Sequence, residues 1–241
     1  LCPLAWIVIG LVGIAFPRNF ALISRVLFPL GAVCALVLAV LVLTGIVAGT
    51  QAVVLPLGLP DLPFHLRLDA LSSFFLFLLG ATAAGISIYA GGYMRQGEGT
   101  APGLHCLIYH LFLASMAFVI LADDGYAFMV SWEGMALSSF FLVTAEHRHA
   151  EIRRAGYLGA VGILLSFGVM AGSTGDYTFD AMRAFPPEGI WPTVAFLLAL
   201  FGFGAKAGLL PLHIWLPEAH PAAPSPVSAM MSGVMLKTAI Y

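Results

Sequence analysis

Long stretches without a charged residue constrain this chain more than any other feature. Four runs contain no Asp, Glu, Lys or Arg: residues 26–48, 70–94, 103–122 and 155–174. A helix needs about 20 apolar residues to cross the hydrocarbon core of a bilayer, and each run meets that length. The composition agrees, because 61% of the 241 residues are hydrophobic and 9% are charged, against roughly 45–50% and 25% in soluble domains. The sequence therefore predicts a membrane protein without a soluble domain between its spans.

We expect an all-α, polytopic bundle of transmembrane helices with about eight spans. The expected spans are residues 1–16, 26–48, 70–94, 104–122, 125–145, 155–174, 191–219 and from 226 onward. The first and last are shorter than a full span at 1.5 Å per residue, which predicts that the chain is a fragment. Between the second and third spans, the stretch VVLPLGLPDLPFHLRLD has three prolines and alternates apolar with polar residues at its end. That pattern predicts an extended or hairpin-like segment at the membrane surface.

The arginines predict the orientation of the bundle. All eight lie in loops or at span edges. Alternate loops on one side carry six of them, and the opposite side carries the other two, Arg67 and Arg183. Because basic loops stay in the cytoplasm, we expect the loop EHRHAEIRR inside and the N-terminus outside.

The two lysines, Lys206 and Lys237, are placed differently, because both lie inside apolar spans. Arginine keeps its proton at biological pH, whereas a desolvated lysine can release one. A charge at this depth is costly and needs a partner. Glu133, in SWEGMALSSFFLV, is the one carboxylate inside the runs that clearly cross. Glu133 and Lys206 are therefore predicted either to form a static ion pair or to exchange protons as a switchable pair.

Residues around Lys206 predict a break in the seventh span. A continuous helix over residues 191–219 would be about 43 Å long, and Gly204, Gly208 and Pro211 weaken it. Backbone groups freed by such a break are tolerated in a membrane only inside protein or beside water, and transporters build ion sites in this way.

Three histidines are candidate relay groups, because histidine exchanges protons near neutral pH. His213 follows Pro211, His220 precedes the last span and His110 lies in the fourth. Each could equally be a residue that only makes hydrogen bonds. Cys2, Cys34 and Cys106 have no paired spacing, and no phosphate-loop, dinucleotide or haem motif occurs. We therefore expect neither a metal site nor a cofactor nor a nucleic-acid partner, and a chain that moves ions rather than electrons.

The blocks SWEGMALSSFFLV and AKAGLLPLHIWLPEAHPAAPSPVSAMMSGVMLKTAIY resemble the antiporter-like membrane subunits of respiratory complex I, membrane-bound hydrogenases and Mrp cation/proton antiporters. The segments HPAAPSPVSA and EHRHAEIRRAG are most similar to the large membrane subunit of hydrogenase-4 and formate hydrogenlyase. The resemblance implies helices 1–3 in residues 1–102 and the first antiporter-like repeat in residues 103–241, with the second repeat beyond Tyr241.

By the same resemblance, Glu133 matches the glutamate of the fifth helix, Lys206 the lysine at the break of the seventh, and Lys237 the lysine of the eighth. The implied function is proton translocation by a non-redox subunit in a bacterial inner membrane. Membrane subunits and peripheral hydrogenase or iron–sulfur subunits would be its partners and would carry the electron transfer. An Mrp-type Na⁺/H⁺ antiporter subunit is the alternative, and a structural scaffold without transport is a third reading.

Overall fold

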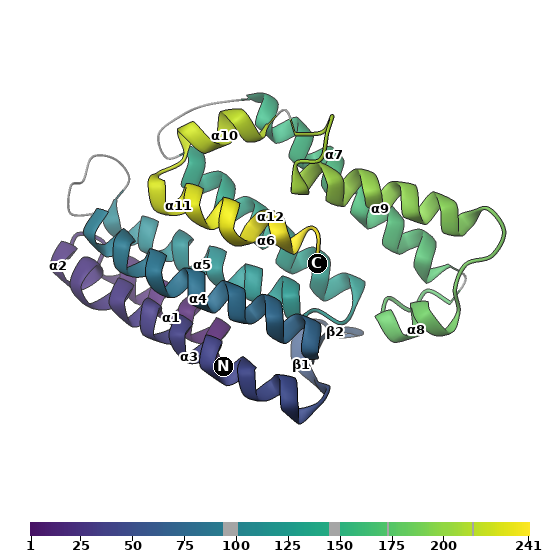
Figure 1. The fold of residues 1–241 in the computed structure, drawn as a ribbon, viewed down its shortest axis with the longest axis horizontal. Helices are drawn as coiled ribbons and strands as arrows, with labels where there is room; N and C mark the ends of the chain where they lie inside the picture. Colours follow the sequence, from purple (N-terminus) through teal and green to yellow (C-terminus); the bar gives the residue numbers. More distant parts are fainter. Residues whose placement is uncertain (94–100, 145–149, 173, 214) are drawn as a thin grey trace.

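The computed structural model describes residues 1–93, 101–144, 150–172, 174–213 and 215–241. Arg95 and Arg148, used above for orientation, lie outside the described residues. Helices dominate the fold and lie side by side (Figure 1). In chain order the main ones are α1 (Cys2–Ala15), α3 (Phe28–Ala48), α4 (Ala70–Tyr93), α5 (Pro102–Leu121), α6 (Gly125–Thr144), α7 (Ala150–Ala171) and α9 (Trp191–Ala207).

Shorter elements complete the chain. α2 (Phe20–Leu22) and a π-helical turn, η1 (Ile23–Leu27), run directly into α3, so the second helix begins before the expected residue 26. α8 (Phe179–Ala184) and α10 (Leu216–Ala222) are single short helices. The last helix consists of α11 (Ser225–Met230), a second π-helical turn, η3 (Met231–Met235), and α12 (Leu236–Thr238).

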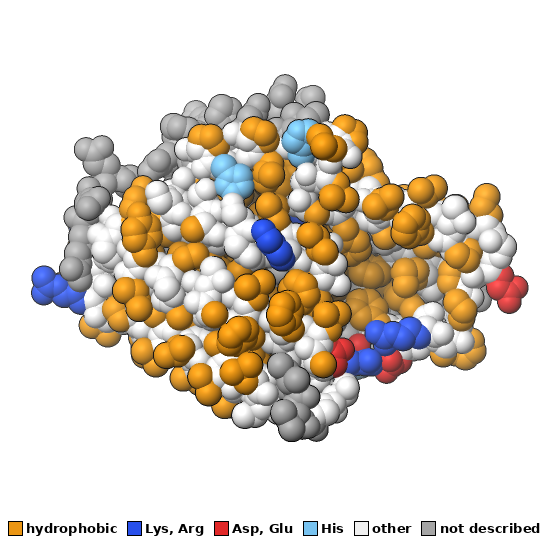
Figure 2. All heavy atoms as spheres, in the orientation of Figure 1, with side chains coloured by type: hydrophobic (Ala, Val, Ile, Leu, Met, Phe, Trp, Pro, Cys, Tyr) orange, Lys and Arg blue, Asp and Glu red, His pale blue; other side chains and the backbone are white. Residues whose placement is uncertain are grey.

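Four described stretches are long and apolar enough to cross a membrane: Phe20–Thr44, Ala70–Tyr93, Pro102–Leu121 and Gly125–Val143. Cys2–Ala15, Gly159–Ala171 and Trp191–Ala207 are shorter apolar helices. The helical membrane architecture is therefore confirmed, whereas the number of eight spans is not. Hydrophobic side chains are spread over the whole face seen in Figure 2, and acidic and basic side chains gather at its edge near α8.

The helix α5 lies in the middle of the bundle and is the most buried of the four long spans. It packs against α1 on one side and α6 on the other, and α3 pairs with α4. Small residues let these helices approach closely, as membrane helices require because lipid is as apolar as their side chains. A Cβ atom added at Gly80 of α4 would meet the carbonyl oxygen of Ala35 in α3 at 2.6 Å.

The expected hairpin is present and consists of β1 (Gln51–Leu59) and β2 (Leu62–Leu68), which pair antiparallel. "All-α" therefore describes the bundle but not the whole chain. The short connection between α5 and α6 is extended, and it pairs with two neighbours: Leu66 of β2 lies opposite Ala122, and Asp124 lies opposite Thr178. We call this arrangement of the hairpin, residues 122–124 and Thr178 the clasp. It lies at one end of the bundle.

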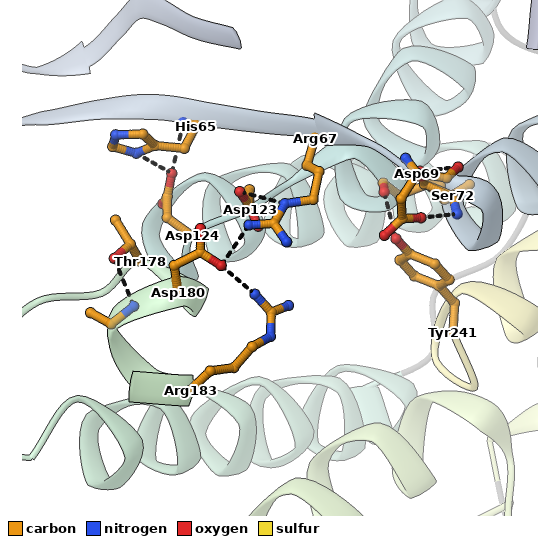
Figure 3. Close-up of polar contacts among 12 residues, drawn as sticks. His65, Arg67, Asp69, Ser72, Asp123, Asp124, Thr178, Asp180, Arg183 and Tyr241 are labelled. Carbon is orange, nitrogen blue, oxygen red and sulfur yellow. Dashed lines mark hydrogen bonds and ion pairs between the residues drawn. The ribbon is translucent and has the colours of Figure 1, made fainter. Parts of the chain in front are cut away.

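Charged side chains reinforce the clasp (Figure 3). The Arg67 guanidinium donates to Asp123 at 2.9 Å and to Asp180 at 2.7 Å, and Arg183 donates to the same Asp180 oxygen at 2.7 Å. These contacts place Arg67 and Arg183 at the same end, as the orientation prediction requires. Hydrogen bonding to Asp180 is the main cause that raises the pKa of Arg67, and the hydrogen bond from Arg67 is the main cause that lowers the pKa of Asp180. Burial raises the pKa of Asp123, and the charge of Arg67 offsets only part of that effect.

Aspartate side chains cap the N-termini of two of the helices. Asp124 accepts from the backbone N–H of Ala127 at 2.5 Å, which caps α6 as its sequence position suggests. Its second oxygen accepts from the backbone N–H of His65 at 2.8 Å, so one side chain joins the helix to the hairpin. Asp69 and Ser72 exchange hydrogen bonds across the first turn of α4, at 2.8 and 2.7 Å.

Replacement of Gly202 should weaken the contact between α7 and α9. A Cβ atom there would lie 2.6 Å from the Ile163 side chain and 2.7 Å from the Gly159 carbonyl, so Gly202→Ala forces the helices apart at a cost of about 1–3 kcal/mol. Gly168→Ala is the matched control, because nothing lies within 4 Å of its Cβ position. The measurement is the thermal stability of the purified protein. Equal stability of the two variants would contradict the close packing.

Loss of Asp180 should loosen the clasp in a pH-dependent way. Because the pKa of Asp180 is lowered in the folded state, its stabilising effect is present above the unfolded pKa of about 3.9 and disappears as the pH falls through the folded value. Asp180→Asn should therefore lower the melting temperature slightly at pH 7. The difference in melting temperature between variant and parent should disappear below about pH 4. Asp61→Asn should have no effect, because Asp61 is an exposed carboxylate of the hairpin turn and forms none of the ion pairs among the described residues. A pH-independent loss would argue against the ion pairs.

Candidate functional site

A helix ends beside Lys206, within the stretch expected to form the seventh span. The helix α9 ends at Ala207, and Gly208 adopts a left-handed conformation with φ 75°. The backbone N–H groups of Gly208 and Leu209 both donate to the carbonyl of Gly204. Gly204 itself is helical, and its carbonyl accepts the capping hydrogen bonds. The break therefore starts at Gly208 and not at Gly204. Pro211 lies in the following turn segment. Glycine suits the cap because it adopts positive φ without a clash.

Trp215 satisfies another carbonyl that the break exposes. Its indole N–H donates to the carbonyl oxygen of Ala205 at 2.7 Å, from the residue that immediately precedes α10. A free carbonyl at this depth would cost several kcal/mol. Sequence reasoning missed this role. The signal was a tryptophan, a donor that needs a partner when buried, only a few residues after a helix breaker.

Lys206 occupies the last turn of α9 and is half-buried. Its ammonium lies 5.9 Å from the ring centroid of Trp132 in α6, a cation–π distance. Glu133, the residue that follows Trp132 in the sequence, interacts electrostatically with Lys206. The described residues form four ion pairs within 4.0 Å, and none of them joins these two side chains. Glu133 is exposed on the surface of the chain, so the arrangement is a loose charge pair over an indole and not a closed salt bridge.

His220 and Lys237 are connected through the last helix. His220 Nδ1 lies 2.8 Å from the Ser228 hydroxyl, and its Nε2 lies 3.4 Å from the Ser232 hydroxyl. The ammonium of Lys237 donates to the backbone carbonyl of Ser232, in the π-helical turn η3. The helix α12, which carries Lys237, packs against α9, which carries Lys206. The structure thus brings His220 of α10 and Lys237 of α12 onto a common residue, Ser232, and packs α12 against the helix that carries Lys206.

The other two histidines differ from each other. His213 lies in the turn after α9, with its Cβ 3.9 Å from the Cβ position of Gly208. Its Nδ1 is buried and has no hydrogen-bond partner among the described residues. His110 is fully buried in α5 and its Nδ1 contacts the Cys106 carbonyl at 2.8 Å. Its ring packs on that of Phe28 in α3, with 5.5 Å between the ring centroids. His213 therefore joins the neighbourhood of the break, whereas the structure does not bring His110 together with either lysine.

A pocket of about 390 Å³ opens next to the clasp. Its wall combines charged side chains, among them Arg67 and Asp123, with aromatic rings from α6, α7 and α9. Figure 2 shows the hollow, lined by hydrophobic side chains, next to the acidic and basic groups at the edge.

Comparison with known proteins adds to this geometry. Residues 122–241 match the family model described as NADH:quinone oxidoreductase/Mrp antiporter, TM. Hydrogenase-4 component B of Escherichia coli K12 is 41% identical over 73% of this chain and 27% of its own length. NADH-quinone oxidoreductase subunit L of Mycobacterium tuberculosis is 32% identical over 77% of this chain and 30% of its own. This chain thus spans less than a third of the length of either relative.

The fold has solved counterparts. A chain of the membrane-bound sulfane sulfur reductase, an archaeal respiratory membrane complex, superposes with a TM-score of 0.78 over 98% of this chain and 39% of its own, at 24% identity. At that identity the likeness concerns the fold alone. From the family match and the relatives, the chain belongs to the antiporter-like membrane subunits of complex I, membrane-bound hydrogenases and Mrp antiporters.

Proposed function

We propose that this chain transfers protons within the membrane as the antiporter-like part of a hydrogenase-4 or formate hydrogenlyase type complex. The position of Lys206 is the observation that carries the proposal. A titratable ammonium lies in the last turn of a helix that breaks one residue later, with an aromatic face and a carboxylate beside it. Buried ionisable groups in membrane helices are functional by default, and lysine is the cation that can release a proton there.

The proposed path leads from Glu133 and Lys206 towards Lys237. In this path Glu133 holds Lys206 protonated, and a proton that arrives on the pair weakens it and favours release. Hydroxyl and imidazole groups near the last helix supply relay sites, because His220 reaches Ser232 and Lys237 contacts the carbonyl of the same serine. His213, whose buried Nδ1 has no partner in the part of the chain that the structure describes, is a second relay site beside the break. His110 lies apart and enters only as a weaker candidate.

The exposed carboxylate of Glu133 supports a role inside a larger assembly. A charged group facing lipid costs energy, so a polar surface of the remaining assembly is expected to cover it. We propose that this assembly lies in the bacterial inner membrane and that its other membrane subunits and peripheral iron–sulfur subunits carry the electron transfer. Within it, residues 1–102 would form helices 1–3 with their hairpin, and residues 103–241 the first antiporter-like repeat.

An Mrp-type Na⁺/H⁺ antiporter subunit is the alternative, and the family match covers both kinds of protein. The higher identity with hydrogenase-4 component B, 41% against 32% for NADH-quinone oxidoreductase subunit L, favours the hydrogenase-type assembly over one of the complex I type.

Purification of the full-length protein with its native partners should separate these readings. We expect hydrogenase and iron–sulfur subunits to copurify, and electron donors to drive proton uptake or release in reconstituted vesicles. The measurement is mass spectrometry of the purified complex together with a pH-sensitive dye in the vesicles. Small Mrp-type subunits in place of redox subunits, with Na⁺-driven proton movement, would establish the alternative.

Replacement of Lys206 by arginine tests the proton transfer itself. Arginine keeps the positive charge but does not release a proton. Lys206→Arg should therefore stop turnover-driven proton movement while the complex assembles at the parental level, which immunoblotting of the membranes measures. The matched control is Arg183→Lys, which keeps a cation in the clasp outside the proposed path and should pump normally. An assembled Lys206→Arg complex that pumps like the parent would reduce Lys206 to a structural counter-ion.

A further inference from the structure

Five aromatic side chains from four helices form a continuous cluster, which we call the aromatic layer: Phe128, Trp132, Phe167, Phe179 and Phe203. Phe128 stacks on Trp132 in α6, with 5.3 Å between centroids and 24° between planes. The ring of Phe203, from α9, meets both edge-on at 5.8 and 5.5 Å. Phe167 of α7 and Phe179 of α8 extend the layer at 5.4 and 5.6 Å. Phe128, Trp132 and Phe167 are all at most 7% exposed.

The layer separates Lys206 from the pocket at the clasp. Phe128, Phe167, Phe179 and Phe203 form part of the pocket wall, together with the charged groups where it opens. Neither Trp132 nor Lys206 belongs to the lining of this pocket. Trp132 lies directly behind Phe128, and the ammonium of Lys206 lies over the Trp132 ring. One thickness of packed rings therefore stands between a space that water can enter and the titratable group.

We propose that the aromatic layer is a proton insulator that closes Lys206 off from the clasp end of the bundle. This inference rests on the proposed function, because insulation matters only if Lys206 exchanges protons. Proton transfer needs water or titratable groups, and the four phenylalanine rings provide neither, while an indole N–H only donates. The negative face of the Trp132 ring attracts the ammonium without accepting its proton. The layer thus holds the ammonium in place and blocks proton transfer towards the clasp, so that protons leave Lys206 towards Lys237.

The test measures passive proton leak in vesicles that contain the full complex and no electron donor. An imposed pH gradient should decay severalfold faster with Phe128→Ala or Phe203→Ala than with the parent, because each change opens a space for water behind the pocket. Phe128→Leu keeps an apolar filling and should stay tight. Phe196→Ala, at a ring of the same helix α9 that is 63% exposed, is the matched control and should also stay tight. Phe203→Val replaces Phe203→Ala if assembly is impaired, with the same expected leak.

A second substitution assigns the leak to Lys206. Adding Lys206→Met to Phe203→Ala should return the decay to the parental rate, because the titratable group behind the layer is gone. Parental decay in the assembled Phe128 and Phe203 variants, or a leak that survives Lys206→Met, would overturn the insulator. The proposed function fails by a different measurement: turnover-driven pumping by Lys206→Met at the parental rate would remove Lys206 from the path, whatever the passive leak shows.

Discussion

The rest of the structure depends on the placement of one ammonium group among apolar helices. Lys206 needs a compensating environment because a charge away from water is costly. It has three neighbours of different kinds: the carboxylate of Glu133, the ring of Trp132 and the backbone of a helix that has just ended. Each gives partial compensation, and none closes into an ion pair. A loosely compensated lysine is easier to deprotonate than one in a tight salt bridge, and the proposed proton transfer relies on this arrangement of the described residues.

The break that accommodates Lys206 is itself stabilised. A helix end leaves carbonyl groups without partners, and in a membrane water does not replace them. Here the Gly204 carbonyl accepts from the two N–H groups that follow the helix, and the Ala205 carbonyl accepts from the indole of Trp215. The described residues of the interruption thus have hydrogen bonds of their own, and His213, whose carbonyl accepts from the N–H of Leu216, is one of them.

Charged side chains join several elements at one end of the bundle. At the clasp, Arg67 and Asp180 join the hairpin to α8, and Asp124 joins the hairpin to α6. These contacts lie beside the aromatic layer, and the proposed insulation requires that α6, α7 and α9 keep their spacing. The glycine contact between α7 and α9 serves the same end, because a backbone separation set by Gly202 leaves little freedom for the rings to part. Packing, ion pairs and aromatic contacts in this part of the chain would therefore all serve the proposed insulation of Lys206.

The sequence by itself determined the elements whose cause is local. Charge-free runs specify membrane helices because the bilayer rejects charge, alternation with prolines specified the hairpin, and the glycines near Lys206 specified a break, although not that it starts at Gly208. It also singled out Glu133, Lys206 and Lys237, since a charge inside an apolar run is conspicuous in one dimension. Only the tertiary structure decided which groups meet. The ring contacts of Phe128, Phe203 and Phe167, the pairing of Arg67 with Asp180 and the bond from Trp215 to Ala205 join residues on different elements. An aromatic residue in an apolar run satisfies lipid and protein equally well, so its partner depends on how helices pack in three dimensions, which no local pattern records.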